Sequence, residues 1–146
     1  MTFEFLLAED RSVRAASRNI EVLEGRGWEG VEFCEADALE PDTLDDALSG
    51  VDTAYYLVHS MGTPGEFEDQ DRRAAESFGR TAKRAGVRRI VYLGGLLPVK
   101  PVSVHLRSRR ETGDVLRTGT VPVIEIRAGM IVGPGSAAFE VIRDLV

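Results

Sequence analysis

TAYYLV (residues 53–58) and GVRRIVYLGGL (residues 86–96) decide the fold, together with the segment between them. The first stretch is apolar without polar alternation, which is typical of a parallel strand that helices cover on both faces. The second contains an apolar run that predicts a strand over residues 87–93. Between them, residues 67–85 predict a helix that ends at Gly86. Its apolar stripe consists of Phe67, Asp71, Ala74, Ala75, Phe78, Ala82 and Ala85. Strand, helix and strand form a right-handed βαβ unit.

The same alternation of strands and helices extends in both directions along the chain. Further strands are predicted over residues 13–17, 31–36 and 121–127. Further helices are predicted over residues 20–24, 41–48, 105–117 and 137–145. These elements predict one α/β domain over residues 1–146, with a mostly parallel sheet and helices on both of its faces.

Composition and charge exclude several classes of protein. The chain is 43% hydrophobic and 29% charged, with a formal net charge of −6, which is typical of a folded soluble protein. The basic residues between positions 72 and 89 are accompanied by acids at positions 66, 68, 69, 71 and 76, so we expect no nucleic-acid partner. No apolar run reaches the length of about 18 residues that a membrane span needs. Cys34 is the only cysteine, which excludes an intramolecular disulfide and a cysteine-based metal site. We expect a cytoplasmic protein without a metal.

The carboxyl ends of the predicted strands are the expected location of a ligand site, as in other open parallel sheets. Several of these ends are rich in glycine or other small residues, including residues 59–62, 94–96 and 128–130. Small residues let a ligand approach the backbone closely. The sequence therefore predicts a pocket at this edge.

Five motifs carry a resemblance to a known family: VRAASR (13–18), EADAL (35–39), AYYLVHSM (54–61), GVRRIVYLGGL (86–96) and RAGMIVG (127–133). In their order and spacing, the chain resembles atypical, NmrA-like short-chain dehydrogenases/reductases. The resemblance implies a Rossmann-like fold and a dinucleotide or small-molecule ligand, with NADP as the cofactor and NAD as the alternative.

The resemblance also implies roles for residues on the adenosine and ribose sides of the cofactor. Arg18 would meet the adenosine 2′-phosphate, since a guanidinium fork suits a phosphate. Asp37 and Ala38 would lie beside the adenine, and His59 and Ser60, with the Met that follows, would border the ribose and nicotinamide. The other interpretations stay open: Arg18 as a solvated loop residue, Asp37 as a helix cap, and His59 as a hydrogen-bonded loop residue.

The superfamily's catalytic Tyr-x-x-x-Lys pair and Ser are not retained. Gly94 and Gly95 stand where the Ser would be, and His105 and Arg109 occupy the Tyr and Lys positions. Arg109 cannot lose its proton, whereas His105 could transfer one. Gly94, Gly95 and Arg109 are also expected to face the dinucleotide. Surface polarity of the helix is the alternative for His105 and Arg109, so catalysis remains open.

Tyr55 and Tyr56 lie within an apolar run of the sequence. We therefore predict that both belong to the core rather than to a site.

The family's first strand and its G-x-x-G-x-x-G turn have no counterpart before Val13, because residues 1–12 contain no glycine. That strand is central in the family's sheet, so its loss opens a slot and removes the pyrophosphate anchor. Cofactor binding is therefore expected to be weak or absent. Residues 9–12 are too few for a parallel crossover. We predict that residues 3–8 enter the slot as an antiparallel hairpin strand. The alternatives are an open slot or a strand from a second chain.

The last predicted helix reaches almost to Val146, where the family continues into its substrate region. Relative to the family, the chain is therefore expected to be truncated at both ends, with its substrate unknown. Three functions follow as alternatives: a NAD(P)-binding domain, a non-catalytic nucleotide-sensing or protein-interaction module, and an inactive fragment. Homo-oligomerisation is left open.

Overall fold

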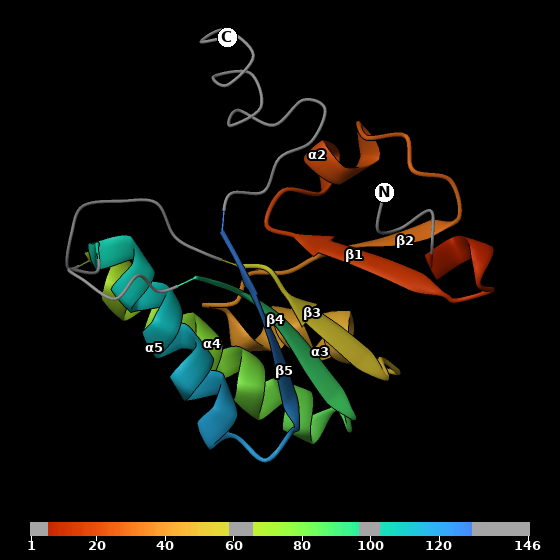
Figure 1. Cartoon of the computed structure of the whole chain (residues 1–146). Helices are drawn as coiled ribbons and strands as arrows, with labels where there is room; N and C mark the ends of the chain where they lie inside the picture. The colour runs from red at the N-terminus through yellow and green to blue at the C-terminus, as the bar shows by residue number, and fades with distance from the viewer. Residues whose placement is uncertain (1–5, 59–65, 97–102, 130–146) are drawn as a thin grey trace, which may run out of the picture.

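A computed structural model of the chain describes residues 6–58, 66–96 and 103–129. The strands are β1 (Val13–Ser17), β2 (Val31–Glu35), β3 (Thr53–Tyr56), β4 (Arg89–Gly95) and β5 (Val123–Ala128). The helices are α2 (Ile20–Glu24), α3 (Pro41–Leu48), α4 (Glu66–Arg84) and α5 (Val104–Thr118). Strands and helices alternate along the chain, which confirms the α/β class (Figure 1). The predicted helix over residues 137–145 lies outside the described residues.

The strands form two separate parallel sheets. β1 pairs with β2, with Val13 opposite Val31. β4 is the central strand of the other sheet and pairs with both β3 and β5. Within the described part of the chain, no strand joins β1 to β3, and the two sheets are visibly apart in Figure 1. The predicted slot is therefore present and open in these residues.

Residues 6–8 are helical, so the prediction of a hairpin strand is wrong for this part of residues 3–8. The amide of Glu9 donates to the carbonyl of Leu6 at 3.2 Å, and that of Asp10 donates to Leu7 at 3.1 Å. Such local bonds form without closing a loop, whereas an inserted strand needs partners on two distant edges. Residues 3–5 lie outside the described residues.

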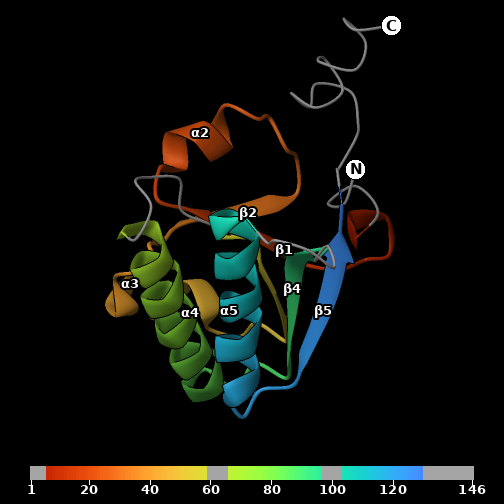
Figure 2. The same ribbon diagram turned by 60° about the vertical axis from the view of Figure 1, so that its left-hand side comes forward.

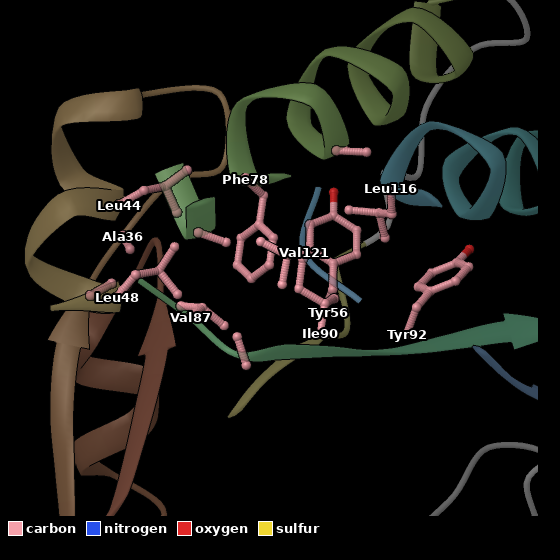
Figure 3. Packing of buried hydrophobic residues seen from close by; sticks show 14 residues of the cluster. Ala36, Leu44, Leu48, Tyr56, Phe78, Val87, Ile90, Tyr92, Leu116 and Val121 are labelled. Atoms are coloured by element: carbon pink, nitrogen blue, oxygen red, sulfur yellow. The ribbon is translucent and has the colours of Figure 1, made fainter. Parts of the chain in front are cut away.

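The core lies between the three-stranded sheet and one layer of helices. α3, α4 and α5 lie side by side on the same side of β3, β4 and β5 (Figure 2). The ring of Tyr56 meets Phe78 edge-on at 4.8 Å between centroids. Figure 3 shows Tyr56 pointing from the sheet towards the helices and Phe78 pointing from α4 towards the sheet. The main buried cluster comprises Ala36, Leu44, Ala47, Leu48, Ala54, Tyr56, Ala75, Phe78, Ala82, Val87, Ile90, Tyr92, Leu116 and Val121.

α4 confirms the predicted stripe and its predicted end. Phe67, Ala75 and Ala82 are almost completely buried, at 1%, 0% and 0% exposure. Gly86 has a φ of 77°, in the left-handed region that favours glycine. The amide of Val87 then donates back to the carbonyl of Ala82 at 2.9 Å and closes the helix.

The three-stranded sheet is covered on one face only in the described residues. Tyr56 is 1% exposed, whereas its neighbour Tyr55 is 47% exposed. The prediction that both tyrosines belong to the core is therefore wrong for Tyr55. Successive residues of a strand point to opposite faces, and no described helix covers the face of Tyr55. The expected cover on both faces of residues 53–58 is likewise absent from the described structure, because Leu57 and Val58 are also exposed.

Arg14 links the two-stranded sheet to α3. Its Nη1 donates to the carbonyl oxygens of Asp46, Ala47 and Ser49, at 3.0, 3.1 and 2.9 Å. These carbonyls lie at the carboxyl end of α3, where helical hydrogen bonding leaves carbonyls without partners. The carbonyl of Asp46 also accepts the amide of Ser49 at 3.4 Å. Its Nε lies 2.9 Å from Oε2 of Glu32 on β2. One side chain thus connects β1, β2 and α3.

Candidate functional site

The carboxyl ends of β1 and β2 bring two of the predicted site residues to one edge. Ser17 pairs with Glu35 at the end of the parallel ladder, so Arg18 and Asp37 follow neighbouring strands. Arg18 is exposed and Ala38 is buried, at 7% exposure. This edge therefore presents a cation and a carboxylate beside a small apolar residue.

The turn after β2 holds Asp37 in place. Its amide donates to Oγ1 of Thr43, and its Oδ1 accepts the amide of Leu39, both at 2.9 Å. The capping interpretation of Asp37 is wrong, because Glu40 is the N-cap residue of α3. The Asp37 carboxylate instead closes its own turn, which is a common use of aspartate.

His59, Ser60 and Met61 lie outside the described residues, so the ribose and nicotinamide side of the predicted site has no structural description. The predicted residues that can be placed on this side belong to β4 and α5.

Gly94 is buried at the end of β4, against a carboxylate. A Cβ on Gly94 would lie 2.7 Å from Oε1 of Glu125 and 3.3 Å from Cε1 of Tyr92. A Cβ on Gly95 would lie 2.9 Å from Cδ2 of Leu106. The serine that the superfamily carries here would therefore collide with its surroundings unless they shifted.

Glu125 is held as an anion below Gly94. The hydrogen bond from Arg127, at 3.1 Å, lowers the pKa of the Glu125 carboxyl; burial opposes this, and a hydrogen bond from Arg117 lowers it further. Arg117 also pairs with Asp114 at 2.5 Å. Glu125 thus has fixed partners that keep it in the space a side chain at position 94 would need.

His105 and Arg109 lie one turn apart on α5, as their spacing predicts, but each has a structural contact. The His105 ring stacks on Phe67 with centroids 4.7 Å apart and 14° between the planes. Arg109 donates from Nη2 to the carbonyl of Leu93 at 2.8 Å, and its Cδ lies 3.8 Å from the Cβ position of Gly95. The structure therefore brings Arg109 and Gly95 together at the end of β4, while His105 packs on α4.

Arg109 also anchors α5 through its backbone. The hydroxyl of Tyr92 donates to the Arg109 carbonyl at 2.7 Å, and burial raises the pKa of that phenol. The Nε of Arg109 is buried and has no hydrogen-bond partner within the described ranges. Arg109 is thus a tether between α5 and β4.

A buried polar pair, Asp71 on α4 and Ser108 on α5, was not predicted from the sequence. The Ser108 hydroxyl donates to Oδ2 of Asp71 at 2.8 Å, and the residues are 2% and 5% exposed. Nearby, Arg107 and Glu68 form an ion pair at 3.1 Å. Asp71 itself was the feature of the sequence that could have revealed this pair, because a carboxylate on an otherwise apolar stripe requires a polar partner.

The described residues contain no group of three or more His, Cys, Asp or Glu side chains arranged to hold a metal ion. Nor do the helices among them include one long and apolar enough to cross a membrane.

Similar solved structures share the fold at low sequence identity. The triphenylmethane reductase of Citrobacter sp., complexed with NADP(H), has a TM-score of 0.67 and 22% identity, over 82% of this chain and 40% of that chain. The Bordetella bronchiseptica enzyme WbmG, in complex with NAD, has a TM-score of 0.73 and 18% identity, over 90% and 49%. ChuY, an anaerobillin reductase from Escherichia coli O157:H7, has a TM-score of 0.73 and 18% identity, over 94% and 69%. The chain thus spans less than half the length of the first two.

The sequence itself places the chain in a family. No curated protein matches it. Residues 1–119 match the family described as NAD(P)H-binding, and this match covers most of the 146 residues. The parallel α/β fold agrees with this match and with the resemblance carried by the five motifs. The chain therefore belongs to the NAD(P)H-binding family.

Proposed function

We propose that the chain binds its dinucleotide mainly through the adenosine half, at the carboxyl ends of β1 and β2, and prefers NADP to NAD. The observation that carries this proposal is the position of Arg18 and Asp37 just beyond the ends of two neighbouring parallel strands. Arg18 supplies an exposed guanidinium for the 2′-phosphate, which NADP has and NAD lacks. The turn around Asp37 is already ordered by Thr43, so binding costs little conformational entropy there.

The pyrophosphate half of the site is weaker. Residues before Val13 contain no glycine, and residues 6–8 are helical rather than part of a strand that leads into a phosphate turn. Without amides from a glycine-rich turn at a helix N-terminus, the pyrophosphate lacks its usual anchor. We therefore expect a dissociation constant weaker than about 1 μM.

Titration calorimetry with NADPH and NADH tests the proposal. We expect NADPH to bind at least about tenfold more tightly than NADH, and Arg18→Ala to remove that difference. Arg88→Ala is the matched control. Arg88 is also an exposed arginine, but it lies at the amino end of β4, whereas Arg18 lies at the carboxyl end of β1. Equal affinity of the unaltered chain for both cofactors would refute the role of Arg18, and sub-micromolar binding would refute the loss of the pyrophosphate anchor.

The second candidate function is a non-catalytic nucleotide-sensing module. It is favoured by the contacts of Arg109, whose guanidinium binds the Leu93 carbonyl, and by Glu125, which occupies the space of a side chain at position 94. Neither residue supplies a phenol or hydroxyl for proton transfer. We expect binding of NADPH without its consumption in the presence of carbonyl or quinone acceptors. Sustained NADPH oxidation with any of them would contradict this candidate.

A further inference from the structure

An apolar surface remains on the three-stranded sheet after all described helices are placed. The register puts Tyr55, Val91 and Ile124 in one row across the strands, and Leu93 and Ile126 in another. We call these five residues, together with Leu57 just beyond β3, the open sheet face. It lies on the side away from α3, α4 and α5 (Figure 2).

Four of the six residues of the open sheet face are exposed where a parallel strand is normally buried. Tyr55, Leu57, Ile124 and Ile126 are 47%, 57%, 48% and 51% exposed. On the central strand β4, Val91 is 9% exposed and Leu93 is half-buried between them. None of the six positions carries a charge or an amide. Together they expose on the order of 500 Å², comparable to the largest apolar patch of a typical monomer, and such patches commonly mark interaction sites.

We propose that a second copy of this chain packs on the open sheet face, so that two sheets meet face to face around a twofold axis. A uniformly apolar sheet face is complementary to itself, as an isologous contact requires. Apolar sheets pack in this way about 10 Å apart, with side chains interleaved. Two copies would bury on the order of 1,000 Å², the lower bound of a specific interface.

The net charge of the chain distinguishes a second copy from a basic partner as the occupant of the open sheet face. The chain has a net charge of −6, so two copies repel each other, and the uncharged face offers no compensating ion pair. Association through this face is therefore apolar. We expect it to strengthen as salt screens the repulsion, whereas binding of a basic partner would weaken.

Analytical ultracentrifugation of the full chain over a range of concentrations tests the proposal. We expect a reversible dimer whose dissociation constant rises at least tenfold in Ile124→Glu, because the carboxylate would be buried without a partner. Val22→Glu is the matched control, since Val22 is 51% exposed on α2 and lies outside the open sheet face. A chain that is monomeric at every concentration, or a dimer equally stable in both variants, would overturn the proposal.

A cysteine probe covers the case in which Ile124→Glu fails to fold. In a Cys34→Ser background, Ile126→Cys places the only thiol on the open sheet face. A second copy on this face predicts that alkylation slows as the protein concentration rises. Alkylation that is slow at all concentrations would assign the face to another segment of the same chain, and alkylation that is fast at all concentrations would leave it uncovered. Either result would overturn the proposal, and neither depends on cofactor binding.

Discussion

Ser108 and Ser77 are both buried serines on long helices, but their hydroxyl groups differ in their partners. Ser108 donates to Asp71 at 2.8 Å, whereas Ser77 Oγ has no hydrogen-bond partner within the residues described. A buried hydroxyl stabilises a fold only when it is hydrogen-bonded, and it carries a desolvation cost in either case.

We therefore predict opposite results for the same substitution at these two positions. Ser108→Ala should lower the free energy of unfolding by about 1 to 3 kcal/mol, since it removes the donor to a buried carboxylate. Ser77→Ala should leave that free energy unchanged or raise it slightly. Urea denaturation of the two variants measures the difference, and an equal loss in both would show that the bond to Asp71 contributes nothing.

Gly94 and Gly79 provide a second comparison at the residue scale. A Cβ at Gly94 would lie 2.7 Å from Glu125, which Arg117 and Arg127 hold, whereas a Cβ at Gly79 in α4 would meet nothing within 4 Å. Gly94→Ala should therefore destabilise the fold by about 1 to 3 kcal/mol through overpacking. Gly79→Ala should stabilise it by about 0.5 to 1 kcal/mol, because alanine favours the helix. Thermal unfolding followed by circular dichroism measures both; a stable Gly94→Ala variant would mean that Glu125 moves away at little cost.

At the scale of elements, α3 is the connection between the two sheets, and Arg14 holds its carboxyl end. The guanidinium binds three carbonyls there and lies beside Glu32, and its side chain is only 24% exposed. A cation at a helix carboxyl end also meets the favourable end of the helix dipole.

Arg14→Ala should lower the free energy of unfolding by about 1 to 3 kcal/mol, because the loss includes charge-assisted bonds to the carbonyls at the end of α3. The control is Arg88→Ala, which removes an ion pair with Asp52 whose side chains are 79% and 64% exposed. An exposed pair of this kind contributes within about 1 kcal/mol. Urea unfolding compares the two variants, and equal small losses would show that α3 does not depend on Arg14.

At the scale of the whole molecule, the two sheets are stabilised unequally. Ala15 is the only buried residue of β1 and β2, whereas β4 alone contains several, including Ile90 and Tyr92. An isolated two-stranded sheet is marginal in water, and here it depends on α2, α3 and Arg14.

Native-state hydrogen exchange should resolve this difference. We expect the amides of β1 and β2 to exchange through an opening of lower free energy than those of β4, which pairs on both sides. The slowest amides of α4 serve as the reference for global unfolding. Equal protection of both sheets would indicate one cooperative unit despite the open slot.

Predictions from the sequence were accurate where the signal is local. The periodicity of neighbouring residues predicted the extent of β1 and α2 and the buried stripe of α4. The end of α4 at Gly86 followed from the positive φ that glycine tolerates. The N-terminal segment was predicted less well, because residues 6–8 are helical where a hairpin strand was expected. The placement of Arg18 and Asp37 after two neighbouring strands followed from the parallel order of the strands.

By itself, the sequence determined the order of elements and the parallel α/β class, since both follow from the periodicity of neighbouring residues. Only the tertiary structure decided that Tyr56 is buried and Tyr55 exposed, that Arg109 binds the Leu93 carbonyl, and that Ser108 meets Asp71. The physical reason is that burial and buried polar contacts depend on which distant segments cover a face. Two adjacent tyrosines of one strand look alike in the sequence until helices cover one side of the sheet and leave the other open.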